Sequence, residues 1–589
     1  MKINKRALAI ITSAFMAVTP LAATGLSAFA TSISISKVAN DTTTHTYKAY
    51  PIITGTLATD GQTLTAMQWN TALDMDKLAT ALTAFDPTAF GSFTTETTPE
   101  QFAEMAKNYA DPEGLAKVFN DTDILPAAQG LSFTGTDPYT CSPTKDGWYL
   151  VRDESATGQI KSANILEVIG DANINPKFSL PSLEKKITDS DGSNPVDANT
   201  AAIGDLVYYN LSTAVPDVTG YDKYYFIVND TLSPGLTYNA DSLVVKIGDT
   251  ILTKDDATIT PSEIKKYYVN TETTADGSTK LEVVFEDFLG TIDNLNAAKG
   301  AAITVSFNAT LNENASIDPT VGNPNKANLT YSNNPNYDGT GSSTTTPDEP
   351  PTPPEGQPSD VVGETPENKV NTYTTAIKIK KVDQDGQPFA EGVQFTLTGT
   401  NLNKVKKVSG STFTVDADGT YWKLNTGAYT TVDPATAGLS DAAKAKYAND
   451  GNKYSKVAAT PSVEDASSGS VTAAVDAEGY ITFYGLNAGN YTLEETSVPD
   501  GYNKAPVEAF ELTAPTKNEN SATWNNSNTN FSLNASTYEY EIQIENRKGN
   551  TLPTTGGIGT KLFYLFGGLL VAGSVVLLVT KKRMAVKEN

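Results

Sequence analysis

The chain has 589 residues and a formal net charge of -25, with one cysteine and one histidine. This acidic balance excludes a nucleic-acid partner, because phosphate neutralisation needs clustered lysine and arginine. A single cysteine excludes an internal disulfide framework, and with a single histidine it leaves little material for a nucleophilic triad or a zinc site. We therefore expect no metal or other cofactor. A secreted glycosidase or protease stays open only because acidic pairs are plentiful.

Residues 1–30 have the parts of a secretory signal peptide. Three basic residues within the first six precede an apolar run over 7–26, and Ala28-Phe29-Ala30 supplies small residues before a cleavage site. The alternative is a membrane anchor that is never cleaved, which Pro20 and the alanine-rich exit argue against. The mature chain is predicted to begin near Thr31.

The mature chain divides into three blocks with β-strand patterns. Threonine, valine, isoleucine and tyrosine are frequent, and short alternating runs are broken by glycine, asparagine, aspartate and proline. This predicts a mainly β fold of tandem immunoglobulin-like β-sandwich domains. We place the blocks at residues 31–175, 176–370 and 371–549, with a proline-rich spacer near 341–358.

The first block is expected to carry short helices among its strands. Thr98-Pro99-Glu100-Gln101 has the form of a capping box with proline at the first helical position. Apolar residues also recur at helical spacing over 73–85. Lys37 continues the inward alternation of Ile33 and Ile35, but it has no convincing acid and asparagine partner, so we expect it at a solvent-facing strand end.

In the second block, one lysine is predicted to face the core. Residues of equal parity share one face of a strand. Lys185 has the parity of Leu183 and Ile187 and so faces inward, in preference to the next lysine along the chain. Asn325 and Asp230 likewise share parity with apolar residues of their own strands, so all three side chains are predicted to point inward.

The third block repeats this arrangement. Lys381 has the parity of Ile377 and Ile379 and is predicted to follow them onto the core face. Asn546, in the last strand of the block, and Glu495 also alternate with apolar neighbours. A lysine, an asparagine and an acid are thus expected in the core of each of these two blocks.

A lysine in such a core has particular chemistry. An unpaired buried ammonium is costly, so its pKa should fall until the amine is neutral, and a neutral amine is a nucleophile. The asparagine carboxamide offers an electrophile, and the buried carboxyl offers a proton carrier. The alternative is an ordinary lysine-carboxylate ion pair at a strand edge.

The C-terminus has three parts in a fixed order. Leu552-Pro553-Thr554-Thr555-Gly556 is followed by an apolar stretch over 562–580 and a basic tail over 581–589. About 19 apolar residues suffice to span a bilayer, and the basic cluster holds the tail on the cytoplasmic side. The alternative is an ordinary single-span anchor with an incidental pentapeptide. The order resembles the sortase sorting signal of Gram-positive surface proteins, which implies cleavage between Thr555 and Gly556 and transfer of the threonine acyl group to an amine.

Two groups of motifs extend this resemblance over nearly the whole mature chain. Lys381-Val382-Asp383, residues 491–501 (YTLEETSVPDG) and residues 544–549 (IENRKG) resemble the collagen-adhesin B-type repeat. Residues 229–236 (NDTLSPGL) and the strand over 325–334 are similar to the middle domain of sortase-assembled backbone pilins.

The resemblance implies a specific covalent chemistry. In that family, such lysine and asparagine side chains join spontaneously into an isopeptide bond with the help of the nearby acid. Carried over to this sequence, the bonds would join Lys185 to Asn325 with Asp230, and Lys381 to Asn546 with Glu495. Each reaction would run once per molecule, so it would be maturation and not enzyme turnover.

A further lysine is implied as the acceptor for polymerisation. Lys177, in the Asn175-Pro176-Lys177 junction, resembles the lysine of the pilin motif, although only the Pro-Lys pair of that motif is kept. The alternative is a solvated linker lysine, and the nearest competitors as acceptor are Lys161, Lys185 and Lys186.

These features predict a structural subunit of a covalent surface pilus that supports adhesion. Sortase would join Thr555 of one subunit to Lys177 of the next, with other copies of the chain, minor pilins and peptidoglycan as partners. A host surface ligand would be a further partner, and the sequence does not identify it. The alternative is a wall-anchored monomeric adhesin or minor pilin.

Overall fold

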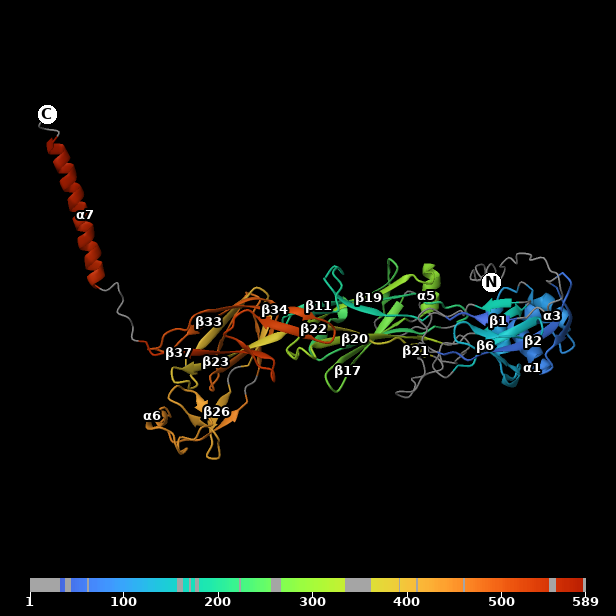
Figure 1. Cartoon of the computed structure of the whole chain (residues 1–589), viewed down its shortest axis with the longest axis horizontal. Helices are drawn as coiled ribbons and strands as arrows, with labels where there is room; N and C mark the ends of the chain where they lie inside the picture. Colours follow the sequence, from blue (N-terminus) through green and yellow to red (C-terminus); the bar gives the residue numbers. More distant parts are fainter. Residues whose placement is uncertain are drawn as a thin grey trace.

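The computed structural model is an elongated molecule in which three β-rich domains follow one another, with a separate C-terminal helix (Figure 1). It describes residues 32–37, 44–60, 63–107, 109–155, 163–168, 171–174, 180–221, 224–255, 266–285, 287–333, 362–390, 392–408, 411–458, 461–549 and 558–585. The expected signal peptide, the spacer near 341–358, Lys177 and the LPTTG pentapeptide lie outside these residues.

In the part of the chain that the structure describes, the N-terminal domain combines two small sheets with four α-helices. One sheet has the order β3-β2-β6-β7 with β4 beside β2, and the other has the order β5-β1-β8. Its strands are β1 Ser32–Ile35, β2 Tyr47–Leu57, β3 Leu64–Trp69, β4 Leu131–Ser132, β5 Tyr139–Cys141, β6 Gly147–Asp153, β7 Ala163–Val168 and β8 Asp171–Ile174. Its helices are α1 Met75–Phe85, α2 Pro87–Phe90, α3 Pro99–Ala106 and α4 Pro112–Asn120.

Sequence patterns predicted two of these helices. Both hydrogen bonds of the capping box form at the start of α3, where Thr98 accepts from the Gln101 N–H and the Gln101 side chain accepts from the Thr98 N–H. In α1 the N-cap is Asp74, and the apolar stripe buries Leu78 and Leu82. Lys37 lies just beyond the end of β1 and is partly exposed.

The second domain is a sandwich of two sheets around one core. One sheet has the order β15-β14-β19-β11-β9 with β13 beside β19, and the other has the order β10-β22-β20-β12-β18-β17-β16 with β21 beside β20. The elements are β9 Glu184–Thr188, β10 Ala198–Thr200, β11 Leu206–Ala214, β12 Phe226–Leu232, β13 Leu236–Tyr238, β14 Val244–Ile247, β15 Thr250–Ile251, β16 Thr253–Lys254, β17 Lys266–Thr273, β18 Thr279–Phe285, α5 Phe288–Leu295, β19 Ala302–Leu311, β20 Asn323–Ser332, β21 Val362–Glu364 and β22 Asn368–Tyr373.

Strand β22 corrects the predicted boundary at 370/371. It pairs antiparallel with β20 and parallel with β10, so all of Asn368–Tyr373 lies in a sheet of the second domain. The predicted boundary is wrong because β22 follows the spacer in sequence, and strand alternation does not indicate which sheet a strand joins. The passage to the third domain lies at Thr374, between β22 and β23.

The third domain is also a two-sheet sandwich. Its sheets have the orders β30-β25-β32-β23-β37-β36 and β31-β24-β33-β34-β35. The strands are β23 Thr375–Asp383, β24 Gln394–Gly399, β25 Lys404–Val408, β30 Ser462–Asp465, β31 Ser470–Ala474, β32 Tyr480–Leu486, β33 Gly489–Ser497, β34 Glu508–Lys517, β35 Ala522–Asn526, β36 Ser532–Leu533 and β37 Glu539–Asn546.

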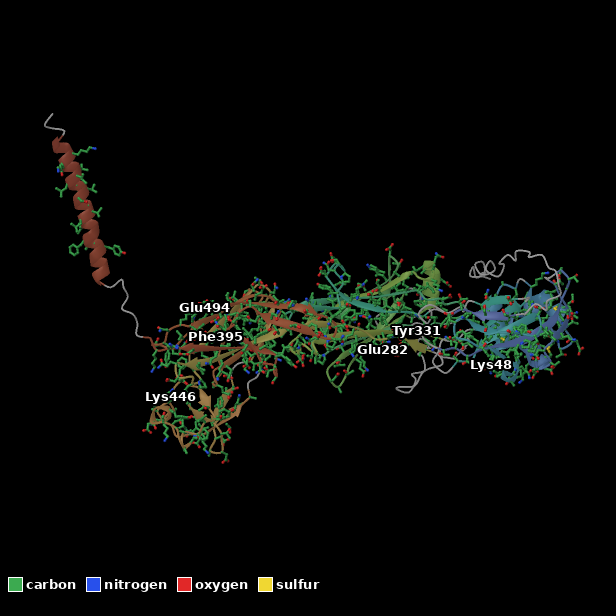
Figure 2. The ribbon with its side chains drawn as sticks, viewed as in Figure 1. Lys48, Glu282, Tyr331, Phe395, Lys446 and Glu494 are labelled. Atoms are coloured by element: carbon green, nitrogen blue, oxygen red, sulfur yellow. The ribbon has the colours of Figure 1, made fainter. Side chains whose placement is uncertain are left out.

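A small subdomain is inserted between β25 and β30 and projects from the side of the rod (Figure 1). Sequence reasoning did not separate it from the third domain. Its elements are β26 Thr412–Val415, β27 Trp422–Lys423, β28 Tyr429–Thr430, α6 Asp441–Lys444 and β29 Tyr454–Val457. Lys446 ties it to the sandwich, with its Nζ 2.8 Å from Asp385 Oδ2. Figure 2 labels Lys446 in this projection and Phe395, a buried residue of the sandwich core.

The second and third domains are joined by backbone hydrogen bonds. The Ile203 N–H donates to the Gly485 carbonyl at 3.1 Å, and the Lys404 N–H donates to the Ile203 carbonyl at 2.9 Å. Gly485 has a φ of +82°, and a Cβ there would lie 2.3 Å from the Ile203 side chain. A side-chain contact lies elsewhere: the hydroxyl of Tyr373, at the end of β22, donates to the carbonyl of Asn518, in the turn after β34, at 2.9 Å. The joint is therefore made at two separate places.

The last described element is α7 Ile558–Ala585. Tyr564–Lys582 within it is long and apolar enough to cross a membrane, with a mean hydropathy of 1.8. It stands apart from the sandwiches in Figure 1. Its apolar side chains are exposed rather than covered by protein, which suits a lipid environment.

Candidate reaction sites in the second and third domains

In the second domain, Lys185 lies in the core between the two sheets. It is on β9, directly opposite Leu211 of β11, and its side chain is fully buried. The Nζ lies 5.1 Å from the ring centre of Tyr209 and 5.4 Å from that of Phe307, both on neighbouring strands of the same sheet. The inward orientation predicted from strand parity is confirmed.

Asp230 and Asn325 approach this lysine from the opposite sheet. Asp230 is on β12 and Asn325 on the adjacent β20, where it lies opposite Leu232 and Val370. Both side chains are buried. Asp230 Oδ2 contacts Lys185 Nζ, and the Asn325 side chain is also next to the Asp230 carboxyl. The three predicted residues therefore meet at one point between the sheets.

Burial changes the acid-base chemistry of this group. Burial lowers the pKa of Lys185, and the nearby Asp230 charge opposes that change without overcoming it. Burial likewise raises the pKa of Asp230 to about 6, against the opposing effect of Lys185. Both changes favour the neutral amine and the protonated carboxyl over the ion pair. This is the protonation state that attack of an amine on a carboxamide requires.

Lys186, the next residue, shows the ordinary alternative. Its Nζ lies 2.8 Å from Asp197 Oδ1 and 3.3 Å from Glu184 Oε1, and its side chain is partly exposed. The hydrogen bond to Asp197 raises its pKa, so it stays charged. One step along β9 thus separates a surface lysine whose pKa is raised from a core lysine whose pKa is lowered.

In the third domain, the lysine and the asparagine lie in the same sheet. Lys381 is on β23 and Asn546 on β37, two adjacent parallel strands in which Lys381 pairs with Ile544 and Asp383 pairs with Asn546. The side chains of both Lys381 and Asn546 are fully buried. Lys381 Nζ donates to the Ile544 carbonyl at 3.1 Å. The predicted inward orientation of Lys381 is confirmed here as well.

The acid of this site comes from the opposite sheet. Glu495 is on β33, and its Oε1 lies 3.7 Å from Lys381 Nζ and accepts a hydrogen bond of 2.9 Å from Asn546 Nδ2. Its other oxygen accepts from the Ala505 N–H at 2.8 Å. Glu495 Oε1 therefore connects the amine with the carboxamide. Burial lowers the pKa of Lys381 to about 8, so a neutral fraction exists near neutral pH.

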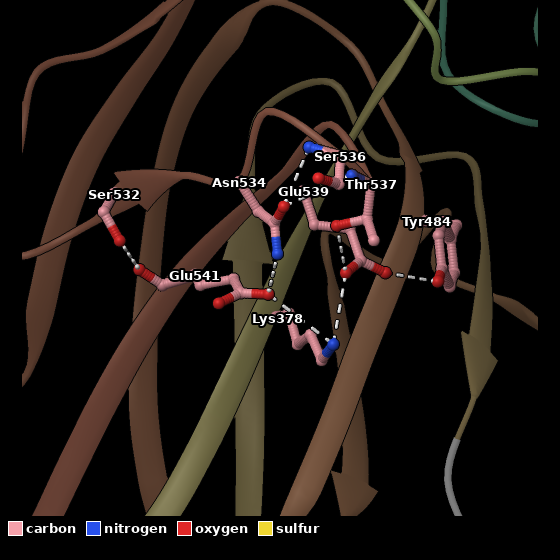
Figure 3. A network of polar contacts seen from close by, with 8 residues as sticks. All are labelled: Lys378, Tyr484, Ser532, Asn534, Ser536, Thr537, Glu539 and Glu541. Carbon is pink, nitrogen blue, oxygen red and sulfur yellow. Dashed lines mark hydrogen bonds and ion pairs between the residues drawn. The ribbon is translucent and has the colours of Figure 1, made fainter.

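A second lysine on β23 gives a direct contrast (Figure 3). Lys378 points to the other side of the strand, with its Nζ 3.3 Å from Glu539 Oε2 and 3.6 Å from Glu541 Oε1. The Tyr484 hydroxyl donates to Glu539 at 2.5 Å, and Asn534 donates to Glu541 at 2.9 Å. The two carboxylates raise the pKa of Lys378 against the effect of its partial burial. A lysine, a glutamate and an asparagine can thus meet without forming a reactive group, because this lysine stays charged.

Sequence reasoning missed two residues of the second-domain site. The hydroxyl of Tyr209 lies beside the side chains of Asn325 and Thr372, and Thr372 comes from β22. The parity of Tyr209 with Val207 and Leu211 indicated that its ring faces inward, but not toward which residues. Thr372 gave no signal, because its strand was assigned to the wrong domain.

Three family models match the chain. They are the Gram-positive pilin backbone subunit 2, Cna-B-like domain, over residues 203–335; the SpaA prealbumin-like fold domain over 432–528; and the LPXTG cell wall anchor motif over 544–585. The first includes Asp230 and Asn325, the second includes Glu495, and the third includes Asn546 and the LPTTG pentapeptide.

Known proteins of similar sequence or structure are surface proteins and pilins. The trypsin-resistant surface T6 protein of Streptococcus pyogenes serotype M6 is 25% identical over 437 residues, which cover 69% of this chain and 70% of that protein. The solved T6 backbone pilin of S. pyogenes has a TM-score of 0.48 at 16% identity, covering 88% of this chain and 98% of its own. The major pilin SpaA of Corynebacterium diphtheriae has a TM-score of 0.41 at 13% identity, covering 88% and 100%.

Proposed function

We infer that this chain is a backbone pilin of a Gram-positive surface pilus, anchored to the cell wall through its LPXTG motif. The observation that carries this conclusion is the order of parts along one chain: a pilin backbone domain, a prealbumin-like domain and a cell wall anchor. The apolar helix α7 holds the precursor in the membrane until the anchor is processed.

We propose that the subunits are joined covalently end to end. A sortase would cleave between Thr555 and Gly556, hold the Thr555 acyl group as a thioester, and transfer it to the Lys177 amine of another subunit. Repetition of this step gives a fibre, and transfer to peptidoglycan ends it. Minor pilins and a host surface ligand complete the expected set of partners.

The polymer can be tested on cell wall extracts boiled in SDS. The wild-type chain is expected to give a ladder of high mass, and Lys177→Ala is expected to reduce it to a single band. Lys186→Ala and Lys161→Ala are the controls, and both should keep the ladder. A single band from the wild type would favour the monomeric adhesin or minor pilin. Loss of the ladder only in a control would move the acceptor to that lysine.

We also propose that Lys185 joins Asn325 and that Lys381 joins Asn546. The neutral lysine Nζ attacks the asparagine Cγ, and the carbonyl electron pair moves to Oδ1. A proton passes from Nζ through the carboxyl of Asp230 or Glu495 to Nδ2, the Cγ–Nδ2 bond breaks, and ammonia leaves. The contacts of each acid with both reacting partners support these roles. Each reaction happens once, so it is self-catalysed maturation.

These bonds would define how the fibre carries load. Force would enter at Lys177 and pass along the chain to Lys185, where the first bond carries it to Asn325. It would then follow the chain to Lys381, cross the second bond to Asn546 and leave at Thr555. The N-terminal domain precedes Lys177 and would carry none of it. The stretch between Asn325 and Lys381 is then the longest part of the path with no covalent bypass, about 190 Å when fully extended at roughly 3.4 Å per residue.

Force spectroscopy on single subunits pulled from these two ends tests this path. The wild-type chain is expected to extend only by the length of the Asn325–Lys381 segment and of the short segments next to Lys177 and Thr555. Extension of each domain over its whole length at low force would contradict the proposal.

A further inference from the structure

We propose that Tyr209 takes part in bond formation in the second domain: its hydroxyl, oriented by Thr372, donates a hydrogen bond to the Asn325 carboxamide oxygen and stabilises the charge that develops there. This inference rests on the proposed Lys185–Asn325 bond and adds a group to it. Tyr209 would act directly on the reacting carboxamide, whereas Thr372 would be a positioning residue that acts through Tyr209.

The first observation is a cluster of buried polar atoms around one lysine. Among the residues that the structure describes, Tyr209 Oη, Thr372 Oγ1, Asp230 Oδ1 and both carboxamide atoms of Asn325 are buried without a hydrogen bond of normal geometry. Buried polar groups are rarely left without partners, because each one costs about 1–3 kcal/mol. Several such atoms in one place indicate that their hydrogen bonds form during the reaction and not in the unreacted chain.

The second observation is the position of the hydroxyl. Tyr209 is on β11, diagonally across from Lys185, with its ring centre 5.1 Å from Lys185 Nζ, and its hydroxyl lies beside the side chains of Asn325 and Thr372. The carboxamide therefore has the Asp230 carboxyl as one neighbour and the Tyr209 hydroxyl as another. Burial raises the pKa of Tyr209, so its hydroxyl keeps its proton and remains a hydrogen-bond donor.

The chemistry needs a donor at this place. When the Lys185 amine attacks Cγ, negative charge develops on Oδ1 in a site closed to water, where a fixed donor has a large effect on the barrier. Asp230 has to carry the proton from the amine to the leaving nitrogen, and a second donor leaves it free for that transfer. The overall reaction stays balanced: an amine and a carboxamide give an amide and ammonia, and Tyr209 ends with its own proton.

The arrangement of Lys185, Tyr209 and Asn325 also depends on strand β22, which follows Asn325 in the sequence. This strand places Thr372 beside Tyr209 and Val370 opposite Asn325, and its Asn368 Oδ1 accepts from the backbone N–H of Lys185 at 3.2 Å. Thr372 and Val370 are fully buried. The second-domain site is therefore complete only when the chain as far as Tyr373 has folded onto it.

The test compares Tyr209→Phe with Tyr208→Phe in the full chain. Tyr208 is the preceding residue of β11, on the other face, and only partly buried. Both variants are made in a Lys381→Met background, so that the fall in intact mass of about 17 Da, one ammonia, reports the second-domain bond alone. The rate of this fall is followed at fixed temperature after a short expression.

We expect Tyr209→Phe to slow bond formation by about a hundredfold to a thousandfold, as for loss of one donor to a developing oxyanion. Thr372→Val should slow it less, and Tyr208→Phe should match the background chain. Equal rates for Tyr209→Phe and the background would overturn the inference. No fall in mass in the background chain itself would instead overturn the proposed Lys185–Asn325 bond.

A purely structural role for Tyr209 is separated by a second comparison. In chains that cannot react, the double variant Lys185→Met/Tyr209→Phe should melt no lower than Lys185→Met, since the donor acts only in the reaction and its removal takes away a buried hydroxyl that has no partner at rest. A large fall in the double variant, with the rate effect explained by unfolding, would contradict the assigned role.

Discussion

The second and third domains bring the same three residue types together by different routes. In the second domain the lysine stands alone on one sheet, and the acid and asparagine share the other. In the third domain the lysine and asparagine are neighbours in one sheet, and the acid reaches them from the other. What the two groups share is therefore a buried lysine, asparagine and acid that meet in the core, and not a particular strand order.

The two acids also differ in how they are held. Asp230 has one oxygen on Lys185 and the other without a partner, whereas Glu495 receives donors on both oxygens, one of them the Ala505 N–H. The second-domain carboxyl thus has fewer fixed neighbours. The Tyr209 hydroxyl lies beside the Asn325 carboxamide of this site and also beside Thr372.

The largest expected effect comes from removing one lysine at a time. Each bond would close a loop of about 140 residues in the second domain or 165 in the third, which by analogy with disulfides contributes on the order of 5 kcal/mol. Lys185→Met and Lys381→Met should each lower the melting temperature of their own domain by roughly 10–20 °C in calorimetry.

Lys186→Met and Lys378→Met are the matched controls for this comparison. Each removes a charged lysine that lies on the same strand as Lys185 or Lys381 but on its other face. A change in the free energy of unfolding of about 1 kcal/mol or less is expected for Lys186→Met, as for an exposed ion pair. Lys378→Met should cost more, but less than Lys381→Met, because it leaves the buried Glu539 carboxylate without its lysine. If the controls destabilised as much as Lys185→Met and Lys381→Met, the covalent account of stability would fail.

A smaller effect is expected in the pH dependence of the third domain's free energy of unfolding, which should distinguish a free Lys381 amine from one that has formed an amide. In Asn546→Ala the Lys381 amine remains, with its pKa at about 8, below the ordinary 10.5. A depressed pKa contributes stability that is present above the unfolded value and is lost as pH falls through the folded value. The third domain of Asn546→Ala should therefore lose up to about 3 kcal/mol between pH 10 and pH 7, relative to wild type, in which the proposed amide would replace the amine.

Adding Lys381→Met to Asn546→Ala provides the control for the pH experiment. With no amine left to titrate, the difference from wild type should become independent of pH over this range. A pH dependence that persists in the double variant would assign it to some other group.

The smallest expected effect tests whether the two domains act independently. Gly485→Ala adds a Cβ at a φ of +82° and 2.3 Å from Ile203, whereas Gly386→Ala adds one at a φ of +75° with no atom within 4 Å. Both should cost about 1–2 kcal/mol for the backbone conformation. Only Gly485→Ala should also disturb the joint, seen as a change in the small-angle scattering profile. Identical profiles for the two variants would show that Ile203 does not fix the joint.

Strand alternation was enough to predict which side chains face inward at both sites. Lys185, Asp230 and Asn325 could be identified because period two fixes the face of every residue once the apolar neighbours are known. The same rule identified Lys381, Glu495 and Asn546. Capping chemistry predicted α3 from a few adjacent residues.

The remaining features depend on pairing between distant strands, which alternation does not encode. Thr372 reaches Tyr209 only because β22 returns to the second domain after the spacer. The subdomain between β25 and β30 has short strands and turns much like those around it, so no pattern marked it as separate. Which sheet carries the acid could not be predicted either, because parity gives the face of a strand and not its neighbours.

The most direct test of the account is the intact mass of residues 31–549, measured after purification under denaturing conditions. Two bonds predict a mass about 34 Da below that calculated from the sequence, with a deficit of about 17 Da left in either Lys185→Met or Lys381→Met and none in the double variant. A wild-type mass equal to the calculated one would show that the buried lysines remain free amines, and would contradict the covalent account of both sites.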